Sequence, residues 1–204
     1  MKELFYRLKY VFIIFNFFAL SNCTFFGPVK TKPQIAYELS GLPAVPIKKR
    51  TSKILMVPQP DSLPMYNTTQ MFYTPKPYQI ASFSQNRWAD TPAQMLHPLL
   101  IQSLQKMNYF HAVVSPPYTG KYDYLLNLQV LELKQDFIYR PATLKFSLKV
   151  DLIKSVGNRI LVTKIIKITE PMRFCNPYNG VLAANRVTKQ LLSQINALVV
   201  RYAR

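Results

Sequence analysis

The chain has 204 residues, 49% of them hydrophobic, so it is long enough for one globular domain and too hydrophobic for a disordered basic tail. It carries 26 Lys and Arg against 9 Asp and Glu, a formal charge of +17, which favours an anionic partner: nucleic acid, anionic lipid or an acidic protein. Five glycines, two cysteines and two histidines argue against a glycine-rich phosphate loop or a multi-ligand zinc cluster, so we expect no cofactor and no metal.

Residues 1–22 resemble a secretory signal peptide. A basic start precedes an apolar stretch, residues 11–20, that has about half of the ~20 residues needed to cross a bilayer. Export makes nucleic acid an improbable partner. The remaining chain has 23 basic and 8 acidic residues, a charge of +15.

The segment ends in Leu20-Ser21-Asn22-Cys23, which resembles a bacterial lipobox. There the cysteine thiol is the nucleophile that accepts the lipid, so we expect lipidation at Cys23. The alternative is a plain signal peptide with a free thiol. Thr24 stands where Asp would indicate inner-membrane retention, and this favours an outer-membrane anchor facing the periplasm. If Cys23 carries lipid, Cys175 has no disulfide partner and is expected to be a structural thiol.

Residues 23–52 are rich in proline and lysine and predict a lipidated, extended tether with one short strand at 36–39. Its densest basic run is Lys48-Lys49-Arg50. A solvated tether is the simpler interpretation of this run. The functional interpretation is contact with a partner or with anionic headgroups.

We expect residues 53–204 to form the folded domain. An apolar run at 54–57 predicts a buried strand, and segments 70–73 and 78–83 flank a proline-rich turn like the two arms of a hairpin. Aromatic residues gather in this region: Tyr66, Phe72, Tyr73, Tyr78 and Phe83. Most should pack within strands, and an exposed subset would suit lipid or a partner. Trp88 either seals the core, the interpretation we prefer, or contacts a partner.

A helix is expected after Asp90 or Thr91, with Pro92 at its first position and Gln94 completing a capping box. Pro98 lies inside it and should kink it. Beyond a short strand at 112–114, alternating apolar residues at 124–133 and 145–152 and a returning strand at 159–169 predict an antiparallel meander. Its wet face is expected to carry four lysines: Lys145, Lys149, Lys164 and Lys167.

The apolar spacing of the last 30 residues predicts an amphipathic C-terminal helix carrying Val187, Leu191, Ile195, Leu198 and Tyr202. With the preceding strands, the pattern predicts a single α+β domain: a mixed, mostly antiparallel sheet with two main helices.

Short segments along residues 35–198 resemble the ABC-type transport auxiliary lipoproteins. They include Arg87-Trp88-Ala89-Asp90-Thr91-Pro92-Ala93, Tyr122-Asp123-Tyr124 and Thr169-Glu170-Pro171. The resemblance implies a lipoprotein beside the permease, ATPase and mammalian-cell-entry (MCE) protein of a transporter for phospholipid or another hydrophobic molecule. It implies a membrane anchor, support of outer-membrane integrity and no catalysis, and it leaves open a homo-oligomer.

No catalytic constellation is visible in the sequence. His97 lies inside the predicted helix, before Pro98, and His111 lies just after it; both are expected to be structural or on the surface. Glu132 and Asp136 look like part of a solvated charge cluster. We therefore expect no enzymatic activity. The alternative function is a structural envelope lipoprotein that binds cell-wall or envelope-assembly proteins. A third hypothesis, a direct lipid carrier, requires an apolar cavity within the domain.

Overall fold

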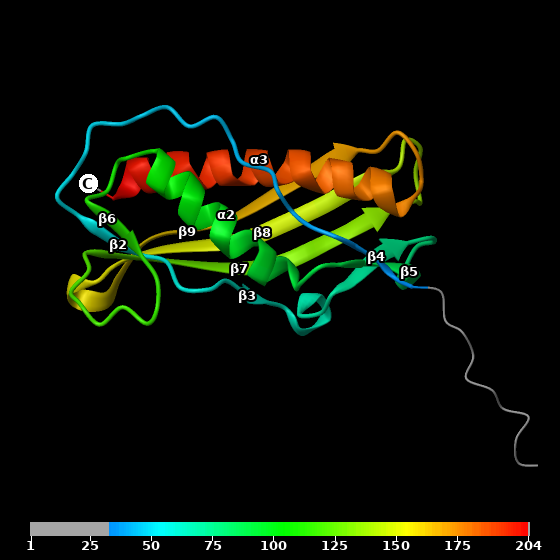
Figure 1. Ribbon diagram of the computed structural model, residues 1–204, viewed down its shortest axis with the longest axis horizontal. Helices are drawn as coiled ribbons and strands as arrows, with labels where there is room; N and C mark the ends of the chain where they lie inside the picture. Colours follow the sequence, from blue (N-terminus) through cyan, green and yellow to red (C-terminus); the bar gives the residue numbers. More distant parts are fainter. Residues whose placement is uncertain (1–32, 204) are drawn as a thin grey trace, which may run out of the picture. The chain divides into compact units, whose positions relative to one another are not determined.

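The computed structural model describes residues 33–203, and residues 34–204 form one compact unit. The predicted signal peptide and Cys23 therefore lie outside the described residues. Within the described range the strands are β1 (Ile35–Tyr37), β2 (Ile54–Met56), β3 (Asp61–Ser62), β4 (Gln70–Thr74), β5 (Ala81–Trp88), β6 (Ala112–Val114), β7 (Tyr124–Asp136), β8 (Thr143–Lys154) and β9 (Arg159–Pro171). The helices are η2 (Pro64–Tyr66), α2 (Pro92–Lys106), η3 (Val156–Asn158) and α3 (Pro177–Tyr202) (Figure 1). None of these helices is long and apolar enough to cross a bilayer.

These strands form one mixed sheet organised around β7. One edge of β7 pairs antiparallel with β8, which pairs antiparallel with β9. The other edge is completed along its length by three short parallel strands: β2 at its start, β3 in the middle and β4 at its end. Antiparallel pairing thus joins the longest strands, and the expected α+β fold with a mixed sheet and two main helices is confirmed.

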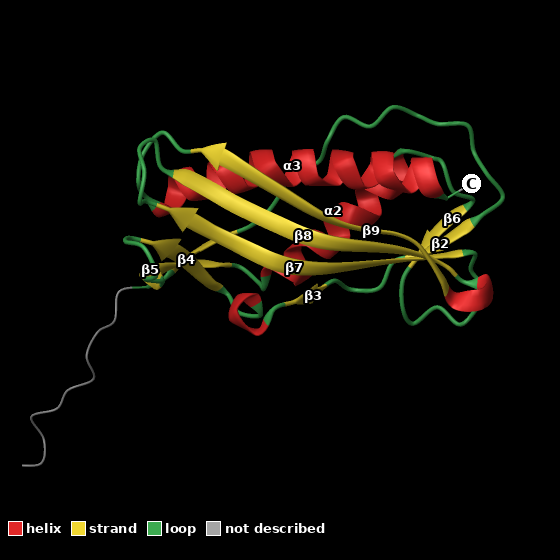
Figure 2. Ribbon diagram, turned by 180° about the vertical axis from the view of Figure 1, so that it is seen from behind, coloured by secondary structure: helices red, strands yellow, loops and turns green. Residues whose placement is uncertain are grey.

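Helices α2 and α3 lie on the same face of the sheet and make a two-layer domain (Figures 1 and 2). The apolar residues that were expected to share a side of the C-terminal helix are almost all buried, Leu191 and Ile195 at 0% exposure, and Leu96 and Leu100 of α2 are equally buried. Tyr202 is the exception, because it lies in the last turn and is 39% exposed. The core therefore sits between the helix layer and the alternating inward side chains of β7 and β8.

The start of α2 follows from local hydrogen bonding. The Thr91 hydroxyl accepts from the Gln94 backbone N–H, as expected of an N-cap. The reciprocal half of the capping box differs, because the Thr91 backbone N–H donates to the Asp90 carboxylate at 2.7 Å instead of to the Gln94 side chain. Both residues proposed as caps thus act on the same turn.

The outer face of the sheet carries an alternating set of charges. Three lysines pair with three acids there: Lys134 with Glu132, Lys145 with Asp136 and Lys149 with Asp151. The prediction that Lys164 shares this face is wrong. Its register partner is Val150, whose side chain lies in the core, so Lys164 belongs to the helix-facing side of edge strand β9.

The described part of the predicted tether is packed on the domain. β1 pairs with β5, and the segment then crosses the helix layer to β2 (Figure 1). We call residues 38–51 the strap. Leu39 is 5% exposed, the Ser40 N–H donates to Asn185 Oδ1 of α3 at 2.6 Å, and Lys48 N–H donates to the Met107 carbonyl. Composition suggested a projecting segment, but these contacts hold it against the helices.

Candidate functional site

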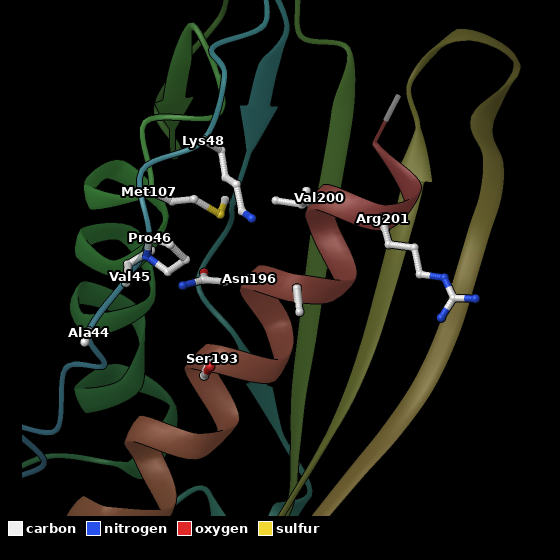
Figure 3. Close-up of a pocket in the computed structure, with 10 residues that line it drawn as sticks. Ala44, Val45, Pro46, Lys48, Met107, Ser193, Asn196, Val200 and Arg201 are labelled. Atoms are coloured by element: carbon white, nitrogen blue, oxygen red, sulfur yellow. The ribbon is translucent and has the colours of Figure 1, made fainter.

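A cavity of about 330 Å³ lies between the strap and the C-terminal halves of the helices (Figure 3). Such a volume is at the lower end for pockets that hold small molecules. Its walls combine apolar and polar side chains: Ala44, Val45, Pro46, Lys48, Met107, Ser193, Asn196, Ala197, Val200 and Arg201. The cavity exists because the strap, which brings three of its apolar residues, bridges α2 and α3.

Asn196 is the buried polar group of this cavity. It is 6% exposed, and its Nδ2 donates to the hydroxyl of the fully buried Ser103 at 2.8 Å. Its Oδ1 has no hydrogen-bond partner among the described residues. Because this oxygen is fully buried, a molecule in the cavity could reach it only if the side chain moved, so it is an unsatisfied group of the helix layer and not a contact offered to a guest. In Figure 3 the Lys48 ammonium also extends toward the cavity, near Val200.

The predicted contact residues occupy different environments. Lys48 and Lys49 are exposed on the strap, and the Arg50 guanidinium donates to the His111 carbonyl at 2.7 Å. Trp88 ends β5 in the core at 2% exposure, so its ring offers no surface to a partner. The structure thus brings Lys48 to the cavity but keeps Trp88 away from it. Sequence reasoning missed Asn196 and Met107, which only look like ordinary residues of helical segments.

His97 and Asp136 make structural contacts. His97 Nε2 donates to the Val57 carbonyl at 3.1 Å and so ties α2 to the end of β2. Asp136 is 5% exposed and accepts from Lys145 Nζ at 2.5 Å, so the expectation of a solvated cluster is wrong for this residue. Within residues 33–203, no three His, Cys, Asp or Glu side chains come together in a way that could hold a metal ion.

Electrostatics around Asp136 favour its charged form. Burial alone would raise its pKa, but hydrogen bonds from Lys145 Nζ and the Ile138 N–H outweigh it, and the pKa lies below the ordinary value of 3.8. The same hydrogen bond raises the pKa of Lys145. At neutral pH both groups are therefore charged, and the pair fixes the end of β7 against β8.

The aromatic residues of the first half of the chain and Cys175 differ in their exposure to solvent. Tyr66 is buried, and burial raises its pKa to about 12, with a smaller effect from Glu132. Tyr73 and Phe83 stack at 4.5 Å between ring centroids, whereas Tyr78 is fully exposed. Cys175 is an exposed free thiol in the β9–α3 loop, so the expectation of a structural thiol is wrong.

Taken together, these features define a two-layer α+β domain with a surface cavity closed by an N-terminal strap. The model of one known family matches residues 37–196, which include the strap, α2, all of the meander and most of α3. The chain belongs to the family of ABC-type transport auxiliary lipoprotein components.

Solved structures show the same fold. The chain is similar to protein XCC0632 from Xanthomonas campestris, with a TM-score of 0.70 and 16% identity over 84% of this chain and 95% of that one. It is also similar to a second, uncharacterised protein, with a TM-score of 0.67 and 15% identity over 82% of this chain and 99% of that one. No curated protein sequence matches the chain. At these identities the similarity concerns the fold alone.

Proposed function

We propose that the protein is a non-catalytic auxiliary lipoprotein of an MCE-type ABC transport system. The system would move phospholipid or another hydrophobic substrate across the periplasm and support outer-membrane integrity. The observation that carries the proposal is the family match over residues 37–196, which extends through nearly the whole described domain. The anchor is lipid on Cys23, in the outer membrane, with the domain facing the periplasm.

The size of the cavity supports an auxiliary role rather than that of a carrier. A volume of about 330 Å³ corresponds to a cube with edges of about 7 Å. An acyl chain of a phospholipid spans about half of the ~30 Å hydrocarbon core, or about 15 Å, and a phospholipid has two such chains. A whole lipid therefore needs more room than this cavity offers.

Three kinds of partner follow from the proposal: the MCE protein, the permease and the ATPase. Lys48 and Lys49 remain candidate contact residues, because they are exposed on the strap and form no ion pair within the described range. Arg50 is a weaker candidate, since its guanidinium already donates to the His111 carbonyl. A homo-oligomer is compatible with the same role.

Crosslinking in cells tests the partners. Affinity-tagged protein should recover MCE and permease subunits, and Lys48→Glu with Lys49→Glu should recover less of them than a Lys164→Glu control on β9. Recovery of cell-wall or envelope-assembly proteins in their place would contradict the proposal and favour the structural alternative.

The anchor has its own test. Cys23→Ser should abolish acyl labelling and release the protein from membranes, whereas Cys175→Ser should leave both unchanged. An acyl label retained by the Cys23→Ser protein would refute lipidation at this residue.

A further inference from the structure

Three connections of the chain meet at one end of the sheet. The register places Thr74 of β4 beside Asp136 of β7, and Thr143 of β8 beside Pro171 of β9. The β4–β5 turn (75–80), the β7–β8 loop (137–142) and the β9–α3 loop (172–176) therefore lie together, next to the start of α3 (Figures 1 and 2). We call these three segments and the first turn of α3 the loop end.

The loop end presents large aromatic side chains to solvent. The four most exposed large aromatic residues of the described chain all belong to it: Tyr78 (108%), Tyr139 (75%), Tyr178 (56%) and Phe174 (55%). Single exposed apolar residues are ordinary on protein surfaces, but a group of aromatics from three separate connections marks an interaction surface.

A packed aromatic cluster holds this surface in place. The Tyr73 ring lies 4.5 Å from that of Phe83 and 5.3 Å from that of Phe137. The Phe137 N–H also donates to the Thr74 carbonyl at 3.0 Å. The β4–β5 turn is thus fixed to the β7–β8 loop, so their exposed aromatic residues are presented together.

The loop end is also basic. Each of its three connections carries one basic residue without an ion pair among the described residues: Lys76, Arg140 and Arg173. The nearby acids are neutralised by other bases, Asp136 by Lys145 and Glu170 by Arg186. This end therefore carries about three uncompensated positive charges, with the Arg173 guanidinium 5.3 Å from the centre of the Phe174 ring.

The chain enters the domain toward the same end. β1 runs parallel to β5, and Gln34 Nε2 donates to the Ser84 carbonyl at 2.9 Å. Gln34 therefore lies toward the beginning of β5, which adjoins the β4–β5 turn. Cys23 lies 11 residues before Gln34 in the sequence, and this length of chain reaches at most about 40 Å.

We propose that the loop end is a peripheral binding surface for an anionic lipid membrane. Tyrosine is enriched at the membrane–water interface, where its ring meets the acyl boundary and its hydroxyl meets water, and basic residues beside it bind lipid phosphates. The orientation of the domain at the membrane rests on the proposed anchor at Cys23. In this orientation, the turn between β8 and β9 (residues 155–158) and Lys48 of the strap face away from the lipid.

A fluorescent probe on Cys175 tests this directly, because this exposed thiol lies within the loop end. The chain from residue 23 with Cys23→Ser retains the whole compact unit, Gln34–Arg204, and has one cysteine to label with a polarity-sensitive dye. We expect a blue shift with phosphatidylcholine vesicles that contain phosphatidylglycerol, and little change with phosphatidylcholine alone. Val156 lies on the exposed turn at the other end of β8. The same dye on Val156→Cys, in a chain that also carries Cys23→Ser and Cys175→Ser, should not respond.

Charge variants give the size of the effect. Each basic side chain near an anionic surface contributes about fivefold to partition, so removing all three should weaken vesicle binding about 100-fold. The variant is Lys76→Gln, Arg140→Gln and Arg173→Gln, and its matched control on the rest of the domain is Lys106→Gln, Lys121→Gln and Lys164→Gln. Because all six side chains are exposed, an unchanged melting temperature should accompany both sets.

Absence of vesicle binding, equal response of the two probes, or equal loss in both charge variants would overturn the proposal. Capture of a protein partner by the loop end without vesicle binding would overturn it as well. Since the tested chain carries no acyl group, these outcomes do not depend on whether Cys23 is lipidated or on the transport system. If the wild-type protein showed no acyl label, the proposed anchor at Cys23 would be refuted, but the vesicle-binding result would not change.

Discussion

Gly41→Ala tests whether the strap is packed on α3. Gly41 is buried, and a Cβ at this position would overlap the carbonyl oxygen of Asn185 and lie 3.1 Å from Lys189 Cγ. The carbonyl belongs to the backbone of a 26-residue helix, so the strap must move. The change therefore acts on the contact between the strap and the helix layer.

Two responses can relieve the overlap, and the one that costs less determines the result. Straining the strap in place costs about 1–3 kcal/mol, typical of an added methyl in a packed site. Releasing the strap exposes Leu39, which costs about 1.5–3 kcal/mol of stability. It also breaks the hydrogen bond from Ser40 to Asn185, which costs about 1 kcal/mol more. We therefore expect a loss of about 1–3 kcal/mol with the strap strained but attached.

Urea unfolding followed by the fluorescence of Trp88, which is the only tryptophan and is 2% exposed, measures this loss. The melting temperature should fall by about 2–4 °C for each kcal/mol. Tryptic cleavage after Lys48 or Lys49 should become faster. Gly157→Asn is the control, because no atom lies within 4 Å of its new Cβ and Asn tolerates the positive φ. If the urea midpoint and the rate of tryptic cleavage were both unchanged, the strap would not be packed on α3, and the prediction of a projecting tether would be correct.

Three further substitutions probe the helix layer and the sheet. Thr91→Ala removes the acceptor for the Gln94 N–H and should lower the free energy of unfolding by about 1 kcal/mol, measured by urea denaturation. Leu100→Ala should cost about 2–5 kcal/mol in the same assay, because the side chain is fully buried. Asp136→Asn should cost about 1.5 kcal/mol at pH 7. A carboxyl whose pKa is lowered by folding stabilises the native state above its ordinary pKa, here 3.8, and loses this contribution as the pH falls below it. The difference between wild type and variant should therefore shrink below about pH 4 in thermal melts, and a constant difference would contradict the role given to the pair with Lys145.

Periodicity predicted the parts of the fold that local patterns determine. The apolar spacing of α2 and α3 and the alternation in β7, β8 and β9 are properties of neighbouring residues, so they can be read from one segment at a time. Strand β3 has only two residues and leaves no pattern. β5 extends to Trp88 although residues 84–87 are polar, because pairing with β1 and β4 fixes the strand and leaves these side chains exposed or half-buried.

Composition misled where packing is determined by tertiary contacts. Prolines and lysines made the strap look like a free tether, but the burial of Leu39, the close approach of Gly41 and the hydrogen bond from Ser40 hold it on α3. The cavity is lined by the strap, the C-cap of α2 and α3, with residues as far apart in the sequence as Ala44 and Arg201, so no local motif indicates it. Tyr78 was visible as part of an aromatic region, whereas Tyr139, Phe174 and Tyr178 join it only once the topology is known.

The arrangement of three short strands along β7 has a consequence for folding. Leu55, Asp61 and Phe72 pair with residues 69, 68 and 62 positions later in the chain, so each contact taken alone closes a long loop at an entropic cost of about 4 kcal/mol. Because β2, β3 and β4 follow one another along β7 in chain order, the first of these contacts brings the others close. The long closure is then needed once, and the remaining strands join by closing loops of only a few residues. The β7–β8–β9 meander, whose pairings are local, is the template on which this zippering proceeds.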